Sequence, residues 1–169
     1  METSHRFKII LYGNVAVGKT SIVNRYVNNK FEQDYISTLG YNVLEKIIET
    51  KGARISFLIF DIGGQEQFTE LRKQYSKGAN AALIMYDITN RESFDNVRNW
   101  VSDLMEFTDN ARFVLIGNKV DLEDQRAVTA EEGAILADQL FADGFFETSA
   151  KENIGIDKAF LKFAEILVG

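Results

Sequence analysis

Residues 13–20 read Gly-Asn-Val-Ala-Val-Gly-Lys-Thr, two glycines separated by four residues and followed by Lys and a hydroxyl residue. An apolar, strand-like run at residues 7–12 precedes this octet, and a helix predicted over residues 19–28 follows it. A strand that passes through a glycine-rich turn directly into a helix is typical of α/β folds built on a parallel sheet. No other feature of the chain constrains the fold as strongly.

Strand-like and helix-like segments alternate along the rest of the chain. Residues 41–50 and 54–60 predict two strands joined around Lys51 and Gly52. This connection is too short for a parallel crossover, so the pair must be antiparallel. Three further runs predict strands, and they are residues 81–86, 112–116 and 145–148.

Amphipathic segments between the strands predict the covering helices. Thr129 is expected to begin one helix, with acidic residues in its first turn. Helical spacing aligns Phe94, Val97, Val101, Leu104 and Thr108 over residues 91–107, and it aligns Ile156, Ala159, Phe160, Phe163 and Leu167 near the end. We expect a single α/β domain over residues 1–169, with residues 1–5 as a flexible N-terminus. Its sheet has six strands, mostly parallel with one antiparallel strand, and about five helices on both faces.

Composition excludes several classes of function. The chain has 19 Lys and Arg against 25 Asp and Glu, a net charge of −6, so we expect no nucleic acid partner. Cysteine is absent, which excludes disulfides, thiol catalysis and cysteine-ligated zinc within this sequence. The longest apolar run, residues 81–86, is far too short to span a membrane. The single histidine, His5, is expected in a frayed terminus rather than in a metal site. We therefore expect a cytoplasmic protein.

The residue types of the octet suit phosphate binding. Amide groups of such a loop, together with the helix N-terminus that follows, can surround phosphate oxygens. Lys19 would contact the β- and γ-phosphates, and the hydroxyl of Thr20 would ligate Mg²⁺. This pattern predicts a nucleotide site.

Two later segments indicate which base is bound. Residues 118–121, Asn-Lys-Val-Asp, follow a predicted strand at the sheet edge where α/β proteins bind ligands. The carboxylate of Asp121 can accept both the N1–H and the 2-amino group of guanine, whereas adenine has neither donor there. Residues 148–151, Thr-Ser-Ala-Lys, follow the last strand and offer a backbone amide to the guanine 6-oxygen.

Together with residues 61–66, Asp-Ile-Gly-Gly-Gln-Glu, these segments resemble the signature sequences of Ras-superfamily small GTPases over essentially the whole chain. The resemblance implies the P-loop GTPase, or G-domain, fold. Residues 35–38 and 83–89 resemble the Rab branch, whereas residues 39–43 and the 61–65 sequence are closer to Arf proteins.

The resemblance implies a role for individual residues. Gln65 would orient the attacking water, with Gly64 and Lys19 at the γ-phosphate. Mg²⁺ would be held by Thr20 and Thr38, and by Asp61 through water. The implied nucleotide-binding residues are Gly13, Asn14, Val15, Ala16, Val17, Gly18, Lys19, Thr20, Ser21, Phe31, Tyr35, Thr38, Gly64, Asn118, Lys119, Asp121, Leu122, Ser149, Ala150 and Lys151. Phe31 either packs against guanine or anchors a loop in the core, and Tyr35 either covers the phosphates or is an exposed loop residue.

The family resemblance also implies a cycle and partners. GTP would be hydrolysed slowly to GDP, because no arginine of the chain is an evident catalytic group in cis. Effectors would read two exposed segments, residues 30–41 and 61–77, in the GTP form of a monomer. An exchange factor and a GTPase-activating protein would complete the cycle, in trafficking or signalling.

Two features depart from the family pattern. Val15 stands where Ras proteins have glycine and Rab proteins a small residue, so the chain is either a cycling switch or a GTP-locked scaffold with impaired hydrolysis. Ras and Rab proteins continue into a tail with prenylated cysteines, while this sequence stops at Gly169. Peripheral membrane association is expected only if such a tail is missing here.

Asp121 and the lack of a lid-sized insertion disfavour an ATPase or a nucleoside kinase.

Overall fold

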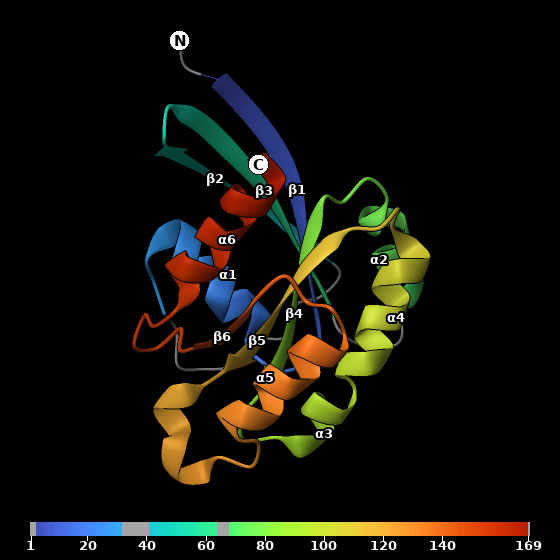
Figure 1. The fold of residues 1–169 in the computed structure, drawn as a ribbon, viewed down its shortest axis with the longest axis vertical. Coiled ribbons are helices and arrows are strands. Elements are labelled where there is room, and N and C mark those ends of the chain that lie inside the picture. Colours follow the sequence, from blue (N-terminus) through green and yellow to red (C-terminus); the bar gives the residue numbers. More distant parts are fainter. Residues whose placement is uncertain (1–2, 32–40, 64–67, 169) are drawn as a thin grey trace.

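The computed structural model describes residues 3–31, 41–63 and 68–168, and within these ranges six strands form one sheet (Figure 1). The strands are β1 (Thr3–Gly13), β2 (Tyr41–Thr50), β3 (Ala53–Ile62), β4 (Ala81–Asp87), β5 (Arg112–Asn118) and β6 (Phe145–Thr148). Their order across the sheet is β2-β3-β1-β4-β5-β6. Only the β2–β3 pair among them is antiparallel. The predicted α/β fold with a six-stranded, mostly parallel sheet is confirmed.

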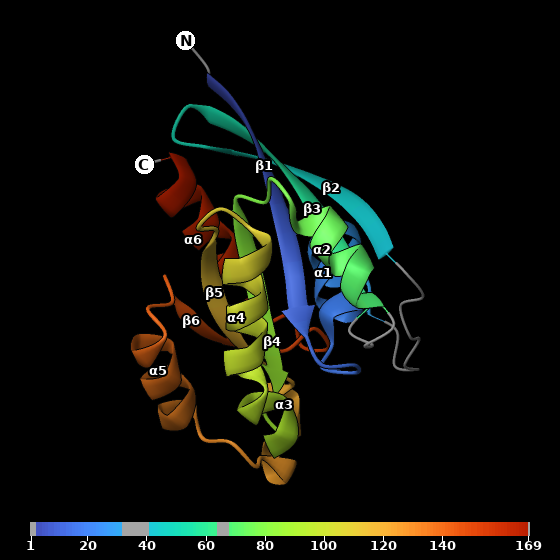
Figure 2. The ribbon, with the colours of Figure 1, turned by 90° about the vertical axis from the view of Figure 1, so that its right-hand side faces the viewer.

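Helices cover both faces of this sheet. The helices are α1 (Lys19–Asn28), α2 (Thr69–Ser76), α3 (Arg91–Asp95), α4 (Val97–Phe107), α5 (Ala130–Gln139) and α6 (Ile156–Val168), with a 3₁₀ segment η2 (Val120–Gln125). Side chains alternate across β1, so Ile9 and Leu11 pack with α1 and α6, while Ile10 and Tyr12 face α3, α4 and α5. Figure 2 shows α4 lying over one face and the arrowheads of β1 and β4 pointing to the same edge. That edge carries the predicted site.

The N-terminal segment differs from its prediction. β1 begins at Thr3, which pairs with Ala53, and His5 pairs with Ile55 and stacks on Phe7 at 5.8 Å between ring centroids. Residues 3–5 therefore extend the first strand, which the apolar run placed at residues 7–12, and residues 1–2 lie outside the described residues. The reason is that β3 extends as far back as Ala53 and offers unpaired backbone groups that these residues satisfy.

The helix predicted over residues 91–107 is two helices, α3 and α4, joined at Asn96. Asn96 has φ −80° and ψ −7°, which lies at the edge of the right-handed helical region and well away from the ideal α-helical ψ. Phe94, Val97 and Leu104 are nevertheless all buried on the same side. Apolar spacing cannot reveal this break, since both helices pack against one face of the sheet.

Residues 61–77, predicted as an exposed loop, are largely ordered secondary structure where the structure describes them. Asp61 and Ile62 close β3 and are buried, and α2 starts at Thr69. α2 buries two polar residues, Arg72 and Ser76, so it lacks the apolar periodicity by which a sequence predicts a helix.

The C-terminal half follows its predictions closely. Thr129 is the N-cap of α5, and a reciprocal capping box joins it to Glu132. α6 buries Ile156, Phe160 and Phe163. Within the described ranges no helix has the length and apolar character needed to cross a bilayer.

Candidate functional site

Residues 13–20 comprise the end of β1, a loop and the first two residues of α1, at the edge to which the parallel strands point. A Cβ atom at Gly13 would lie 2.6 Å from the carbonyl oxygen of Met85. Gly18 has φ +104°, and a Cβ atom there would lie 2.2 Å from Nδ2 of Asn118. Both positions therefore require glycine, one for close packing against β4 and the other also for its backbone conformation.

Lys19 is a buried cation directed at this loop. It is 6% exposed, and its Nζ donates to the carbonyl oxygens of Gly13 at 2.8 Å and Asn14 at 2.9 Å. Burial lowers the pKa of Lys19 to about 8; Asp61 acts to raise that pKa and Arg72 to lower it further. A buried ammonium group that faces neutral carbonyl groups is suited to receive an anion.

Thr20 and Asp61 bring a hydroxyl and a carboxylate together beside the loop. Thr20 Oγ1 donates to Asp61 Oδ2 at 2.5 Å, and Asp61 is almost fully buried at the end of β3. In the described part of the chain no three His, Cys, Asp or Glu residues gather as metal ligands. Mg²⁺ bound with phosphates needs few protein ligands, and these are oxygen atoms. Thr20 and Asp61 therefore fit such an ion.

Asn118, at the end of β5, connects the phosphate loop to the last strand. Its Nδ2 donates to the carbonyl oxygen of Val17 at 3.0 Å, and its Oδ1 accepts from Thr148 Oγ1 at 2.8 Å. Asn118 is 2% exposed. Both ends of its amide thus have partners, and the segments that carry Val17 and Thr148 are held together.

Lys119 makes a second connection to the same loop. Its Nζ donates to the carbonyl oxygen of Ala16 at 2.7 Å and lies 3.0 Å from Asp87 Oδ2, at the end of β4. Lys119 adopts φ +74°, a left-handed conformation that turns the chain into η2.

Asp121 lies beside the segment that follows β6. Ser149 Oγ donates to Asp121 Oδ1 at 2.7 Å and accepts from the amide of Glu152 at 2.9 Å. Ser149 is fully buried, whereas Asp121 is half-buried. The Ser149 contact fixes the orientation of a carboxylate that solvent or a ligand can still reach.

Arg25 on α1 holds the segment of residues 149–151 in place. Its Nε donates to the carbonyl oxygen of Ala150 at 2.7 Å, and its Nη2 donates to that of Lys151 at 3.1 Å. α1 therefore holds the phosphate loop at its N-terminus and the Ala150 segment along its length.

The remaining predicted residues are placed as follows. Val17 is buried in the core, and Phe31 is half-buried and packs against the core beyond α1, so both readings of Phe31 stay open. Val15 is 40% exposed on the loop. Ser21 lies in the first turn of α1, and Leu122 lies within η2. Four predicted site residues lie outside the described residues, and they are Tyr35, Thr38, Gly64 and Gln65.

Sequence reasoning missed several residues that support the site. Asp87 pairs with Lys119, and Thr148 donates to Asn118. Both end parallel strands, so their position at the carboxyl edge was an available signal. Trp100 donates from Nε1 to Asn14 Oδ1 at 2.8 Å, a contact between distant segments that no local spacing predicts.

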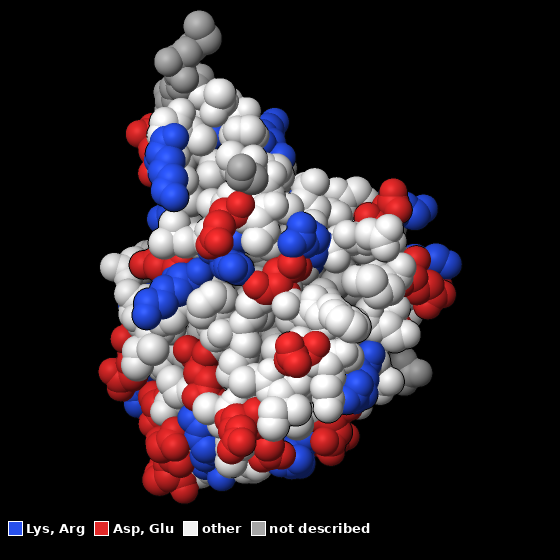
Figure 3. Space-filling view, viewed as in Figure 1, with Lys and Arg blue, Asp and Glu red and all other residues white. Residues whose placement is uncertain are grey.

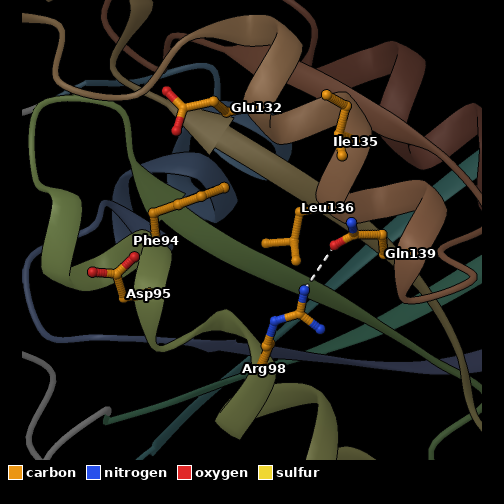
Figure 4. A pocket seen from close by; sticks show the side chains of 7 residues that line it. All are labelled: Phe94, Asp95, Arg98, Glu132, Ile135, Leu136 and Gln139. Carbon is orange, nitrogen blue, oxygen red and sulfur yellow. Dashed lines mark hydrogen bonds between the residues drawn. The ribbon is translucent and has the colours of Figure 1, made fainter.

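Two other surface features lie apart from these residues. On the face shown in Figure 3, acidic and basic side chains are interspersed, and acidic ones gather at the lower end of the view. A hollow of about 280 Å³ lies between α5 and the pair α3 and α4. Arg98 Nη2 donates to Gln139 Oε1 at 2.7 Å across it, and Figure 4 marks this hydrogen bond. The hollow shares no residue with the predicted site.

Comparison with known proteins identifies the family. The Ras family model matches residues 8–168. The Ras-related protein Rab-3D of Mus musculus is 42% identical over 164 residues, covering 96% of this chain and 74% of the relative. Rab-3D of Homo sapiens gives the same values, and Rab-3B of Bos taurus is 40% identical with the same coverage. The predicted resemblance is confirmed: the chain belongs to the Ras family, as a Rab-like small GTPase, a hydrolase of GTP.

Proposed function

We propose that this Rab-like GTPase is a Mg²⁺-dependent switch that alternates between GTP and GDP forms in vesicle trafficking or signalling. One observation carries the proposal: the buried cation Lys19 and the oriented carboxylate Asp121 lie at one edge of the sheet. Asn118 and Lys119 join the segments that hold them. A nucleotide is a ligand with an anionic end and a hydrogen-bonding end, which this pair of groups matches.

The phosphates would bind at the loop of residues 13–20. Amide groups of the loop and of the first turn of α1 would surround the phosphate oxygens, and Lys19 Nζ would exchange carbonyl contacts for contacts with the β- and γ-phosphates. Thr20 and Thr38 would hold Mg²⁺, with Asp61 acting through water. The ion, when bound, neutralises charge that develops on the phosphate oxygens.

Guanine would bind between the 118–122 and 149–151 segments. Asp121 would accept from the N1–H and the 2-amino group, and the amide of Ala150 would donate to the 6-oxygen. Lys119 and Leu122 would border the ring from one side, with Phe31 at its edge. Arg25 supports this role indirectly, because it holds the carbonyl groups of Ala150 and Lys151, which directly follow the proposed amide donor.

Hydrolysis would depend mainly on positioning. Gln65 would orient the attacking water, the amide of Gly64 would bind the γ-phosphate, and Lys19 would stabilise the charge that builds up there. Loss of the γ-phosphate would release the contacts of Thr38 and Gly64, and effectors would distinguish the two forms. Intrinsic turnover is slow in this scheme, and a GTPase-activating protein would accelerate it.

Single-turnover hydrolysis of preloaded GTP tests this scheme. We expect slow release of phosphate with Mg²⁺, none after chelation by EDTA, and a loss of about 10²-fold or more in Gln65→Leu. Gln74→Leu, the same change on the exposed surface of α2, is the matched control and should hydrolyse GTP at the wild-type rate. Equal rates for Gln65→Leu and wild type would contradict the role of Gln65.

Val15 supports a second candidate, a GTP-locked binding scaffold. Its side chain is 40% exposed on the phosphate loop. In this second scheme it would obstruct Gln65 or an arginine from a partner. If Val15 blocks hydrolysis, Val15→Gly should hydrolyse GTP at least about tenfold faster than wild type in the same assay. Similar rates for the two proteins would favour the cycling switch.

The proposed partners and location follow from this function. We propose a monomer that binds effectors, an exchange factor and a GTPase-activating protein, and no nucleic acid. It would be cytoplasmic, or peripheral to membranes where a lipidated tail is present. Light scattering of the GDP-loaded protein tests the monomer directly, and a mass of twice 19.2 kDa would contradict it.

A further inference from the structure

Trp100 connects the phosphate loop to α4. Its Nε1 donates to Asn14 Oδ1 at 2.8 Å, and the ring is 8% exposed. Tryptophan has a single hydrogen-bond donor, so Asn14 takes the whole polar capacity of this side chain. The helix that carries Trp100 is anchored on the sheet, because Val97 and Leu104 on either side of it are fully buried. The side chain of Asn14 is thus held in place by α4, a helix that is packed firmly on the sheet.

The same indole ring contacts α2, which lies against α4. The guanidinium carbon of Arg72 lies 5.0 Å from the centre of the Trp100 ring, and Arg72 is 4% exposed. A cation over an aromatic ring is worth most where water is excluded, as it is here. Tyr12 completes the junction, since its ring centroid is 5.7 Å from that of Trp100 and its hydroxyl group is hydrogen-bonded to Ser76 of α2.

Arg72 links Trp100 to Gly63, which precedes the residues proposed to act in hydrolysis. Its Nη1 donates to the carbonyl oxygen of Gly63 at 3.0 Å, and its Nη2 donates to Thr69 Oγ1 at 3.0 Å. Gly63 directly precedes Gly64 and Gln65 in the sequence. A continuous set of contacts therefore runs from Asn14 through Trp100 and Arg72 to the residue that precedes Gly64.

We propose that Trp100 is a positioning residue for GTP hydrolysis, which sets the place of Gly63, and hence of Gln65, relative to the phosphate loop. The inference rests on the proposed role of Gln65. Trp100 touches neither nucleotide nor water in this scheme and acts through Asn14 and Arg72. Both contacts are made by one rigid ring, so a shift of the loop would also shift Arg72 and, through it, Gly63.

Trp100→Phe tests the hydrogen bond while it keeps an aromatic ring under Arg72. Misplacement of a reacting group by about 1 Å can cost up to about 10²-fold in rate, so we expect single-turnover GTP hydrolysis to fall about tenfold. Leu104→Val, one turn further along α4, loosens the same helix without changing a contact to Asn14. This matched control should hydrolyse GTP within about twofold of the wild-type rate.

Comparing the hydrolysis rate with the affinity for GDP distinguishes a positioning residue from a merely structural one. In Trp100→Phe we expect the dissociation constant for GDP to change by less than about threefold, because the loop amides and Lys19 are unaltered. Asn14→Ala leaves Trp100 in the core and removes only its acceptor, so it should lower the hydrolysis rate to a similar extent even if Trp100→Phe does not fold.

Trp100 is the only tryptophan of the chain, so its fluorescence reports on this junction alone. We expect the emission of the wild-type protein to differ between the GDP form and the form loaded with a non-hydrolysable GTP analogue. In Asn14→Ala that difference should shrink, since the indole N–H loses its acceptor. Identical wild-type spectra, or a hydrolysis rate within about threefold of wild type in the folded variants, overturn the proposal. Failure of wild type to bind guanine nucleotides would instead overturn the proposed function.

Discussion

The two halves of the candidate site are built in opposite ways. On the base side, Asn118, Asp121 and Ser149 have hydrogen-bond partners within the protein. On the phosphate side, the charged group of Lys19 is buried against neutral carbonyl oxygens, and its pKa is lowered to about 8. The base side is already organised, whereas the phosphate side holds a charge that burial destabilises.

This difference indicates what each half contributes. A preorganised set of hydrogen bonds selects among ligands, because a wrong base leaves the polar groups of the site unpaired. A buried cation that is hydrogen-bonded to neutral carbonyl groups gives affinity, since an anionic ligand offers it a stronger partner. Substitutions on the phosphate side should therefore weaken binding without loss of stability, and those on the base side should affect both selectivity and stability.

Lys19→Met should have the largest effect. Removing one member of a buried charge pair costs about 3–5 kcal/mol, so affinity for GDP should fall by roughly 10²- to 4 × 10³-fold in a calorimetric titration. The nucleotide-free protein should be at least as stable as wild type at pH 7, because burial of the ammonium group costs about 3 kcal/mol there.

The pH dependence of stability separates this charge effect from lost packing. The folded pKa of Lys19, about 8, lies below its ordinary value of 10.5, so the unfolded chain binds more protons between these values. Stability of nucleotide-free wild type should rise with pH across that window and gain nothing from this group below pH 8. Denaturant titrations should show that Lys19→Met lacks this rise, and the same slope in both proteins would contradict a buried charged Lys19.

Asp121→Asn should have the next largest effect. The asparagine amide repels the N1–H and 2-amino donors of guanine and suits the oxygen of xanthine, so GDP affinity should fall by about 10²-fold and XDP should become the preferred ligand. Competition binding measures the ratio. Asp124→Asn, three residues along in η2 and exposed, is the matched control and should keep wild-type selectivity. Retained preference for GDP in Asp121→Asn would refute the base assignment.

Gly18→Ala tests the contact between the phosphate loop and Asn118, where the phosphate side of the site meets the base side. An added Cβ atom would lie 2.2 Å from Asn118 Nδ2 at a residue with φ +104°. We expect a loss of about 2–4 kcal/mol of unfolding free energy together with weaker GDP binding. Gly52→Ala has a similar strain, at φ +77°, but meets nothing within 4 Å, so it isolates the backbone cost of about 1 kcal/mol. Equal losses in the two variants would show that the contact with Asn118 is unimportant.

Thr148→Val should have the smallest effect of these variants. It tests whether hydrogen bonds within the protein stabilise the base side. It removes the donor to Asn118 Oδ1, so the unfolding free energy should fall by about 1–2 kcal/mol. Thr50→Val, on the edge strand β2, gives the cost of the same change away from the site. Equal stability of Thr148→Val and Thr50→Val would mean that the base side is not held by this hydrogen bond.

Local patterns in the sequence predicted the sheet and most helices, because alternation, apolar spacing and capping each depend on neighbouring residues. Thr129 and the glycines of the phosphate loop are examples. What could not be predicted depends on segments far apart in the chain. The break at Asn96 is invisible to apolar spacing, and α2 buries Arg72 where a sequence predicts exposure.

The site shows the same division. Its phosphate and base residues are proposed from their types and spacing, and the structure places Lys19, Asn118 and Asp121 at one edge of the sheet. Asp87 and Trp100 were missed, since their partners Lys119 and Asn14 lie 32 and 86 residues away. Such contacts support and orient a site, and they follow only from the fold.

The most direct test of the guanine nucleotide site is to denature freshly purified protein and identify the released nucleotide by chromatography. We predict GDP or GTP at close to one equivalent per chain. GDP would agree with turnover and GTP with impaired hydrolysis at Val15, and both agree with guanine binding. Release of an adenine nucleotide would contradict the roles of Asn118, Lys119 and Asp121.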